Sequence, residues 1–499
     1  MLSQRSALNL MLEVWNGPRH AELPRLDRID QAMRVPPPID RAAMTHFQGS
    51  TRYMGDFQTS VAIPDDAPPI VLELARKSST NYLPLLVRTF RQALRVEGYL
   101  TSAPPDQNPW RWWQANRLDG RQVGLHDAVL KYGAAYVRAF PGDTGPSARV
   151  FSPRNMTAVY QDPEADEWPM ATVHVSGQHL VLTDEEAEYW FSVDDPAAAA
   201  TIGAGGAAAR LGSRSLAYNE ARVHDTGFTP VVRYLDEFLV EGEPHTGIVE
   251  PLIVLQERID ETQFGQLVAQ YFAAFKQRAV LGWVPESEAE ELKAGASRIW
   301  YLDVDPAQVK IEELSETDLT RYIESGKGAR RDFASIGQIP VQSLGVDAIS
   351  NISDATLSGL DKSKNERSGE IALAIGEGHE QLFRLFAHLN GDEDAAADWQ
   401  SEVRWAEREA RTWAGQIDGL VKLVQADILA RDTAMTMVPG MTDQQVELAR
   451  ADARKQRSAA TVTALRAARQ QTSPNRPARP TGAELDAADV TPPGEASAE

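Results

Sequence analysis

The sequence predicts an α+β protein, and two patterns carry that prediction. Between residues 134 and 193, short strand-like runs are separated by turn residues, which is typical of antiparallel hairpins. From residue 247 onward, apolar residues instead recur at three- and four-residue spacing over long stretches, which indicates helices. Strands and helices are therefore largely segregated along the chain, as they are in α+β folds.

The composition excludes several classes of function. The chain has 499 residues, 42% of them hydrophobic, which is enough for several domains and a sizeable core. It has no cysteine, so disulfides, thiolate metal sites and cysteine nucleophiles are excluded. Its net charge of −21 disfavours tight DNA binding, because neutralisation of phosphates by basic groups supplies most of that affinity. We find no signal peptide and no apolar run of about 20 residues, so no membrane partner is expected.

The first hundred residues are predicted to be mainly helical. Residues 1–60 begin with a helical pattern and become irregular around the proline-rich VPPPID. Residues 69–100 are predicted as a helix, a break and a second segment ending near Gly98, with Leu83, Val87 and Phe90 at helical spacing.

A helix that ends at Gly133 leads into the predicted hairpins. Leu125, Val129 and Tyr132 lie on one face of that helix, and Gly133 is a typical terminator. Residues 194–215 are predicted to be an Ala/Gly-rich loop, after which HDTGFTPVVRYLD leads into one more strand. The strands predicted before that loop are AAYVRAF, ARVFSP, MTAVYQ, MATVHV, HLVLT and AEYWFSV.

Two long helical patterns flank a small acidic module. The first runs from Gly247 to about Val280, and about 34 residues at ~1.5 Å each would give roughly 50 Å of helix. The second begins at a capping box, Ser315 with Asp318, and ends near Gly337. The acids between them fit either a solvated face or a weakly binding lining for a polyanion. They are Glu286, Glu288, Glu290, Glu291, Asp303, Asp305, Glu312 and Glu313.

The C-terminal third is predicted to be helical and then disordered. After residues 339–353, a helix is expected from Asp354 to about Leu389, with a possible kink at its paired glycines. Residues 399–470 are expected to be helical again. Residues 472–499 are rich in proline and polar residues, so we expect them to be disordered.

Phosphate- and dinucleotide-binding motifs are incomplete. In GKGARR, Gly328 replaces the Ser or Thr that would bind magnesium, and Arg321 stands where the first glycine of the loop belongs. GAGGAA, residues 203–208, lacks the strand that should precede a dinucleotide loop. A nucleotide-hydrolysing motor and a dinucleotide enzyme are therefore disfavoured.

Metal and catalytic motifs are incomplete as well. HEQLF has Phe383 where a zinc protease needs its second histidine, and DVDPAQ lacks the later ligands of a calcium loop. His126, beside Asp127, fits an ordinary core or surface histidine better than a catalytic one. We therefore expect no catalytic residue, no metal and no cofactor, and the chain is not predicted to be an enzyme.

The order of these parts resembles the portal proteins of tailed bacteriophages, of the kind common in phages of actinobacteria. HDTGFTPVVRYLD, GIVEPLIVLQERID and SIGQIPVQSLG resemble family segments, and the likeness extends over roughly residues 50–430. Asp236 stands near a position where relatives often have asparagine. The run that begins at the tryptophans matches the family through Trp113, Asn116, Leu125, Tyr132, Gly133, Tyr136, Ser152, Pro153, Tyr160 and Asp162.

The resemblance implies an α+β wing, a two-helix stem, a small α/β clip and a helical C-terminal crown. The segments would be an N-terminal arm at 1–60, the first part of the wing at 61–246, stem helix 1 at 247–280, the clip at 281–314, stem helix 2 at 315–338, a channel loop at 339–353, the second part of the wing at 354–429, crown helices at 430–471 and a disordered tail at 472–499.

The resemblance also implies a function. The chain would form a homo-oligomeric ring, dodecameric in this family, at one vertex of the virion capsid, after assembly in the host cytoplasm. Double-stranded DNA would pass non-specifically through the ring during packaging and ejection. The terminase large subunit and then the head–tail adaptor would dock on it, and capsid and scaffolding proteins would surround it.

Particular residues acquire expected roles from this resemblance. In the clip, Glu286, Glu288, Asp303 and Asp305 would face the channel, the terminase or the adaptor. Candidates for the DNA channel are Lys327, Arg330, Arg331, Gln342, Ser343 and Asn351, although intersubunit ion pairing is an equal alternative for the three basic residues. The arginines at 450, 454, 457, 466, 469, 476 and 479 fit either an ordinary helix face or a local phosphate contact.

The stretch PWRWWQANRLDG, with Trp110, Trp112 and Trp113, could stack nucleic acid bases, anchor at a membrane or pack in a core. Base stacking needs a basic, accessible surface, so packing is the expected role, with a neighbouring-subunit contact as the alternative. We expect Trp113 and Leu125 to be buried, Asn116 to cap the turn and Arg111 to point outward. With Tyr132 and Gly133, these are the structural residues predicted for the wing.

Two other classes stay open on the sequence alone. Another structural head protein, a capsid subunit or an adaptor, would lack the paired helices around a small module or would be far shorter. A cytosolic enzyme of unknown class would need a pocket with converging titratable groups. The oligomeric state in solution separates a ring-forming protein from these alternatives.

Overall fold

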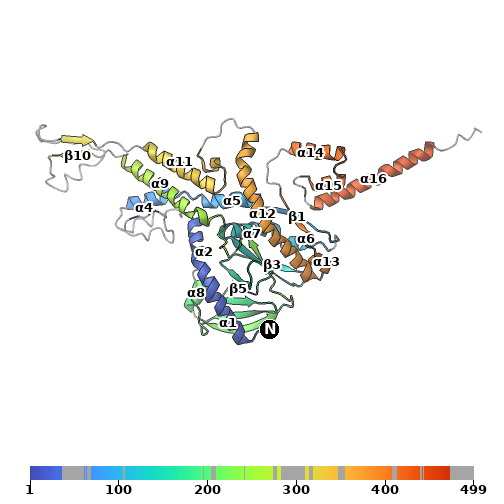
Figure 1. The fold of residues 1–499 in the computed structure, drawn as a ribbon, viewed down its shortest axis with the longest axis horizontal. Coiled ribbons are helices and arrows are strands. Elements are labelled where there is room, and N and C mark those ends of the chain that lie inside the picture. Colours follow the sequence, from blue (N-terminus) through green and yellow to red (C-terminus); the bar gives the residue numbers. More distant parts are fainter. Residues whose placement is uncertain are drawn as a thin grey trace, which may run out of the picture. The chain divides into compact units, whose positions relative to one another are not determined.

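The computed structural model separates into two units, residues 1–412 and 413–499, which are described one at a time (Figure 1). The structure describes residues 1–35, 69–104, 107–194, 196–203, 210–240, 242–273, 278–281, 310–313, 319–346, 354–406, 413–438 and 443–471, together with Val61, Ile63 and Met441.

The N-terminus of the first unit is helical, as the sequence predicted. The hydroxyl of Ser3 accepts a hydrogen bond from the amide of Ser6 at 3.2 Å and caps the first helix. Gly17 departs from helical geometry and Pro18 follows it, so the helix axis bends there. The elements are α1 (Gln4–Val14), the π turn η1 (Trp15–Arg19) and α2 (His20–Met33).

Between residues 69 and 100 the structure confirms two helices and corrects the end of the segment. Leu83, Val87 and Phe90 are buried on one face of α5, as predicted. Residues 96–100, however, form a strand and do not continue the helical segment, because VEGYL pairs with a strand about 300 residues later in the chain. The elements are α4 (Pro69–Ser78), α5 (Leu83–Ala93) and β1 (Val96–Leu100), which pairs with β12 (Glu402–Trp405).

The tryptophan stretch forms a short helix, α6 (Trp110–Ala115), and α7 (Leu118–Tyr132) follows it. Gly133 ends α7 in the left-handed conformation, with φ at 83°, as the sequence predicted.

Two antiparallel sheets follow, with strand orders β3-β2-β9 and β4-β5-β6-β7-β8. The six strands predicted before the Ala/Gly-rich region and the strand after it are all present. The bounds are β2 (Ala134–Phe140), β3 (Ser147–Phe151), β4 (Met156–Val159), β5 (Ala171–Ser176), β6 (His179–Thr183), β7 (Ala187–Val193), β8 (Leu216–Val223) and β9 (Val231–Leu235).

Two features near the Ala/Gly-rich region differ from the prediction. Part of the predicted loop is a helix, α8 (Pro196–Gly203), which agrees with the high helix propensity of its four alanines. The strand β8, Leu216–Val223, was not predicted. It lies at the edge of the five-stranded sheet and is largely exposed, so its sequence lacks the apolar alternation that marks a half-buried strand.

The two long helices are present, but the first is shorter than predicted. A 3₁₀ turn, η3 (Glu250–Leu252), precedes α9 (Ile253–Ala273), and α11 covers Leu319–Ile336. Residues 278–281 form β10 (Arg278–Leu281), which pairs with β11 (Lys310–Glu313). The helical spacing of the apolar residues continued into this strand and therefore did not mark the end of the helix.

The last part of the first unit is built around one long helix. α12 (Asp354–Asn390) continues as one helix through Gly376 and Gly378. Its residues Ile371, Phe383 and Phe386 are fully buried in the main core. The predicted helix over 399–470 is wrong at its start, where β12 lies. The neighbouring elements are the 3₁₀ turn η4 (Val341–Leu344) and α13 (Glu393–Ala396).

The second unit is helical, as predicted for this part of the chain. Its elements are α14 (Trp413–Gln425), α15 (Arg431–Thr436) and α16 (Asp443–Gln471). Arg457 of α16 forms an ion pair with Asp432 at 3.3 Å, and Arg450 donates to the carbonyl of Asp432 at 3.2 Å. These two arginines therefore bind within their own unit. Across the described residues, no helix is long and apolar enough to cross a membrane.

Candidate functional site: the α9–α11 helix pair and its junction with the sheets

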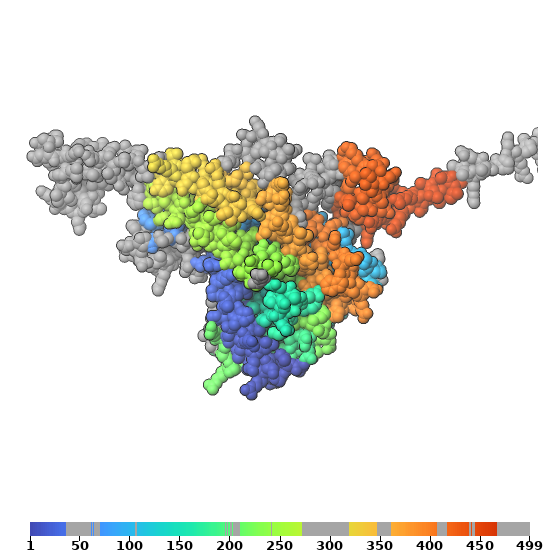
Figure 2. Space-filling model, in the orientation of Figure 1, coloured from blue at the N-terminus to red at the C-terminus, as the bar shows by residue number. Residues whose placement is uncertain are grey.

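The helices α9 and α11 pack side by side and run antiparallel. Arg258 of α9 forms an ion pair with Asp332 of α11, and farther along the pair Gly265 lies against Tyr322. A Cβ atom on Gly265 would lie 3.3 Å from the Tyr322 ring, so the glycine lets the two helices approach closely. Figure 1 shows the two helices lying together, and Figure 2 shows their surfaces in contact.

A polar row on α9 fastens this helix to the segment between α4 and α5. Gln256, Asp260 and Gln263 are spaced as neighbours on one helix face. The Gln256 side chain accepts from the Tyr82 amide and donates to the Thr80 carbonyl, both at 2.9 Å. The Thr80 amide donates to Asp260 at 3.0 Å, and the Thr80 hydroxyl donates to Gln263 at 2.8 Å. Backbone groups that lie outside any helix or strand are thereby satisfied.

Sequence reasoning missed this row, because polar residues at this spacing ordinarily indicate a solvent-exposed face. Nothing in the local sequence distinguishes the two cases. Gln256 is 4% exposed and Asp260 is 5% exposed, so these two residues belong to the interior, while Gln263 is half-buried.

Two glycines form the point where the end of α7 meets the start of the helix pair. Gly133 and Gly247 both have positive φ, 83° and 69°, and their backbones lie against each other. A Cβ on Gly133 would lie 2.7 Å from the carbonyl of His245, and one on Gly247 would lie 2.7 Å from the Leu130 carbonyl oxygen. The Ile248 amide donates to that same oxygen at 2.9 Å. We call this contact the glycine junction.

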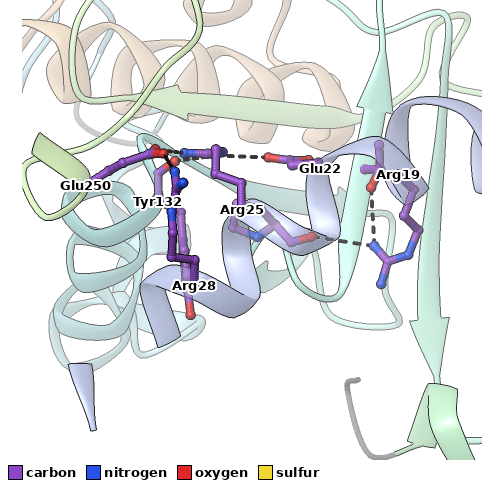
Figure 3. A network of polar contacts seen from close by, with 8 residues as sticks. Arg19, Glu22, Arg25, Arg28, Tyr132 and Glu250 are labelled. Atoms are coloured by element: carbon purple, nitrogen blue, oxygen red, sulfur yellow. Dashed lines mark hydrogen bonds and ion pairs between the residues drawn. The ribbon is translucent and has the colours of Figure 1, made fainter. Parts of the chain in front are cut away.

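Arginines of α2 bind both sides of the glycine junction (Figure 3). Arg25 contacts Glu250 at 3.1 Å, Glu22 at 3.2 Å and the Tyr132 carbonyl at 2.9 Å, and Arg28 also pairs with Glu250. Glu250 stands at the start of η3, where a carboxylate is favoured by the exposed amides of a helix N-terminus. The helix α2 thus bridges the end of α7 and the entry to α9.

Arg19 of η1, also drawn in Figure 3, joins the turn between α1 and α2 to the five-stranded sheet. It is 4% exposed and donates to the Thr157 hydroxyl at 3.2 Å and to the Arg154 carbonyl. Burial lowers the pKa of its guanidinium to about 10, so it still carries its charge at neutral pH.

A chain of buried hydrogen bonds joins α5, α7, α12 and β9. His126 Nδ1 lies 3.0 Å from the Leu94 carbonyl oxygen, and His126 Nε2 lies 2.9 Å from His379 Nε2. His379 Nδ1 lies 3.2 Å from the Tyr234 hydroxyl. Since the carbonyl can only accept, His126 carries its proton on Nδ1, His379 donates from Nε2, and Tyr234 donates to His379. Each proton position in the neutral chain is therefore fixed.

Both histidines in this chain of hydrogen bonds are neutral. Burial lowers the pKa of His126 to about 4, and burial together with the neighbouring His126 places the pKa of His379 well below its ordinary value. Burial likewise raises the pKa of Tyr234. The sequence pointed to His379 only as the first residue of a failed zinc motif, and its partner lies 253 residues away.

The buried histidines predict a loss of stability in acid. The unfolded chain binds a proton at His126 below pH 6.5, whereas the folded chain does so only near pH 4, so the stability from this residue is complete above 6.5 and falls as the pH drops. We expect a loss of about 2 kcal/mol from His126 between pH 6.5 and about pH 5. Urea unfolding across this range measures it.

A matched pair of variants tests whether His126 causes this loss of stability in acid. His126→Leu should flatten the stability profile below pH 6.5, even though it lowers stability at neutral pH by leaving the Leu94 carbonyl without its donor. His20→Gln, on α2 and outside the chain of hydrogen bonds, should leave the profile unchanged. An unchanged slope in the His126 variant would contradict the assignment.

Asp236, just after β9, is buried beside the glycine junction. Its amide donates to the Gly133 carbonyl at 3.3 Å, and its side chain is 1% exposed. Neither carboxylate oxygen has a hydrogen-bond partner among the described residues. Burial, and then the negative charge of Glu237, raise the pKa of this carboxyl to about 7. Ionising this buried carboxyl therefore costs free energy in the folded protein.

The structure places part of the predicted channel set on α11 and η4, which pack against each other. Lys327 is half-buried and binds Glu324 at 2.9 Å, Arg330 is half-buried, and Arg331 is exposed. Gln342 and Ser343 lie in η4. Asn351 lies outside the described residues, as do Glu286, Glu288, Asp303, Asp305 and the capping box at Ser315.

The wing residues lie in the core around α12. Trp113 and Leu125 are fully buried, as expected, and Trp113 stacks on Trp110 at 5.6 Å. The Trp113 ring also lies 5.6 Å from that of Phe383, and its Nε1 donates to Asp119 at 2.9 Å. The three tryptophans of this stretch therefore pack against protein.

Asn116 has a wider role than the expected turn cap. Its amide nitrogen donates to the carbonyls of Trp112 and Pro146, both at 2.9 Å, and its oxygen accepts from the Ala148 amide at 2.8 Å. It therefore joins the turn after α6 to the start of β3. Arg111 is partly exposed, lies over the Trp112 ring and binds Asp392 at 3.2 Å.

The described residues contain no group of three or more histidine, aspartate or glutamate side chains arranged to hold a metal ion. What the structure does show is an antiparallel helix pair whose first helix is held by hydrogen bonds to the segment between α4 and α5, and by two glycines to the end of α7.

Comparison with known proteins identifies this arrangement. The family model for phage portal proteins of the SPP1 Gp6-like type matches residues 52–460. The portal protein of Mycobacterium phage D29 is 24% identical over 383 residues, which cover 69% of this chain and 72% of that protein.

Solved structures of gene transfer agent particles resemble the chain at low identity. A chain of the native virion shares 14% identity with a TM-score of 0.43, and a chain of the native neck, computed with C12 symmetry, shares 12% with a TM-score of 0.44. Each likeness covers 74% of this chain and 94% of the other.

The fold and the family match together define a phage structural protein of the portal class, a connector of the virion. The chain belongs to the SPP1 Gp6-like family of phage portal proteins.

Proposed function

We propose that this portal protein forms a closed ring at one vertex of the capsid, with twelve copies, through which double-stranded DNA passes during packaging and ejection. The observation that carries the proposal is the α9–α11 pair within a chain whose family match spans residues 52–460. From Thr262 to Ala269 every residue of α9 is only half-buried. A helix left half-covered over this length gains stability by packing on a neighbouring copy.

The segments take the roles that the resemblance implied. Residues 247–280 and 315–338 act as the stem, 281–314 as the clip that meets the terminase large subunit and later the head–tail adaptor, and 339–353 as the channel loop. Residues 354–429 act as the second part of the wing, and residues 430–471 act as the crown. Capsid and scaffolding proteins surround the ring, and the ATP-hydrolysing motor is a separate protein, so this chain is no enzyme.

The charge balance supports passage of DNA without tight binding. Each phosphate that pairs with a basic group releases counterions and strengthens binding, so a conduit must keep such pairs few. The chain carries 71 acidic residues against 50 basic ones. Double-stranded DNA would therefore slide past a ring of strongly negative subunits.

Mass photometry and negative-stain electron microscopy of the purified full-length chain test the ring. We expect a population of rings with an axial channel, at a mass of about twelve subunits of 54.9 kDa each. A chain that stays monomeric at micromolar concentration, with and without scaffolding protein, would argue against the proposal. A ring with another number of subunits would correct only the stoichiometry.

A further inference from the structure

One face of α9 is largely exposed among the described residues. Val254, Glu257, Glu261, Phe264 and Val268 are spaced three and four residues apart, so they lie along one side of the helix. Val254 is 71% exposed, both glutamates are exposed, and the last two residues are half-buried. The buried polar row and the contacts with α11 occupy other sides. We call this stripe the acidic face of α9.

A stripe of opposite charge runs along α11. Ile323, Lys327 and Arg331 are four residues apart, and Arg330 adjoins them. Ile323 is 41% exposed, Lys327 is half-buried and Arg331 is exposed. Like the acidic face, this basic face of α11 combines an apolar side chain with two charges one helical turn apart.

The two faces are in register along the helix pair. Arg258 contacts Asp332, Thr262 packs beside Gly326, and Gly265 packs beside Tyr322. Glu257 and Glu261 therefore lie at the same levels as Arg331 and Lys327. The apolar residues follow the same order, since Phe264 lies at the level of Ile323.

We infer that the acidic face of α9 in one copy binds the basic face of α11 in the next copy of this chain. A rotation about a ring axis that runs along the helix pair preserves height, so it brings Glu257 and Glu261 opposite Arg331 and Lys327 of the neighbour. Each pair then has opposite charges, and Phe264 meets Ile323. This inference rests on the proposed ring and names the faces that close it.

Charge also determines which faces of two copies can meet. A two-fold contact between identical faces would set glutamates against glutamates, or lysine and arginine against their own kind, and such contacts repel. A contact between the two different faces is attractive and repeats around the ring. Lys327 keeps Glu324 as a partner within its own chain, so the neighbour adds a second carboxylate to it. The basic residues of α11 are thus assigned to the subunit contact, and the DNA channel is their competing assignment.

Charge reversal in the full-length chain tests the inference. One variant combines Glu257→Lys with Glu261→Lys, and the other combines Lys327→Glu with Arg331→Glu. Each variant alone places like charges across every subunit contact, so we expect the fraction of chains in rings to fall at least tenfold at the wild-type assembly concentration. Circular dichroism and thermal unfolding should stay close to wild type, because the changed side chains are exposed or half-buried.

Mixing the two variants gives the decisive result. In an equimolar mixture, the reversed α9 face of one variant meets the reversed α11 face of the other, and the two unreversed faces also meet. We expect rings to reappear, and native mass spectrometry should find the two variants in equal numbers within each ring. High salt should weaken these rings and the wild-type rings alike.

A matched control separates position from net charge. Glu366→Lys with Glu370→Lys makes the same change of charge on an exposed face of α12, at the same four-residue spacing, and should leave assembly intact. The inference is overturned if either reversed variant assembles like wild type, or if the mixture stays unassembled. Failure of the wild-type chain to form rings would count against the proposed function itself.

Discussion

Replacing Gly133 with alanine is expected to destabilise the protein by more than about 3 kcal/mol, the largest effect of any single methyl group that we predict. Two costs add. The left-handed conformation at φ 83° costs alanine about 1–2 kcal/mol. The new Cβ would also lie 2.7 Å from the backbone carbonyl of His245 and 2.9 Å from the amide nitrogen of Gly247. Both contacts are backbone atoms, so neither can move aside without shifting the entry to α9.

Gly247→Ala should behave in the same way, since its Cβ would meet the Leu130 and Lys131 carbonyl oxygens at 2.7 and 2.8 Å. Urea unfolding of the full-length variants measures both effects. Where a variant does not accumulate as folded protein, limited proteolysis should show cleavage near residues 245–250, because the start of the helix pair is released.

Two control glycines separate the cost of the left-handed backbone conformation from the cost of the close backbone contact. Gly177 has φ 62°, but no atom lies within 4 Å of the place that an added Cβ would take, so Gly177→Ala should cost only the conformational 1–2 kcal/mol or so. Gly124, inside α7 with open space around it, should tolerate alanine or gain up to about 1 kcal/mol. If Gly133→Ala lowered the free energy of unfolding no more than Gly177→Ala does, the close backbone contact would contribute nothing to the predicted destabilisation.

Replacing Asp236 with asparagine is expected to stabilise the protein at pH 8 by up to about 4 kcal/mol, since each unit of pKa shift is worth about 1.4 kcal/mol. The pKa of the carboxyl is raised from 3.8 to about 7 by burial and the nearby Glu237, so above pH 7 the folded chain holds a buried negative charge that the unfolded chain exposes to water. The neutral amide of asparagine avoids that cost and keeps the size of the side chain.

The sign of the pH dependence distinguishes this effect from simple packing. A raised pKa means that the folded state holds the proton more tightly, so wild type gains stability relative to Asp236→Asn as the pH falls from about 7 toward 4. The advantage of the variant should be largest at pH 8 and nearly absent at pH 4. The opposing loss from the buried histidines is common to both proteins and cancels in the difference.

Differential scanning calorimetry at several pH values measures the difference, with Asp143→Asn on an exposed turn as the control that should change stability by less than about 0.5 kcal/mol. A variant that is less stable than wild type at pH 8 would show that the carboxylate has a favourable partner in the assembled protein.

Much of the fold could be predicted from the sequence, where the signal was local. The strands β2 to β7 are short, apolar-rich runs between clear turns, and Gly133 ended its helix as predicted. Failures occurred where the signal was distant. β1 and β12 are each short, and their pairing over about 300 residues gives no local pattern. β8 is an exposed edge strand, and the helical spacing after Ala273 continued into β10.

The candidate site was less predictable than the fold. The charges of α11 were found because they stand out in the sequence, but the acidic face of α9 was hidden among alternating apolar and polar residues. Gln256 and Asp260 have the composition of a solvent face and lie in the interior. His126 and His379 gave weak signals separately, and only their contact at 2.9 Å gives them a shared role.

The amino-acid sequence alone establishes the class of this protein. It is an acidic, cysteine-free α+β chain, and the order of its segments over nearly 400 residues matches that of a portal protein. Periodicity and turn chemistry act over a few residues, so they determine which elements form. The packing of those elements in three dimensions sets which backbones touch and which polar groups are buried. Gly133 is a helix end in the sequence, but in the fold its lack of a side chain also makes room for Gly247, 114 positions later, which lies against it. Contacts of that kind depend on the path of the whole chain, which no local pattern encodes.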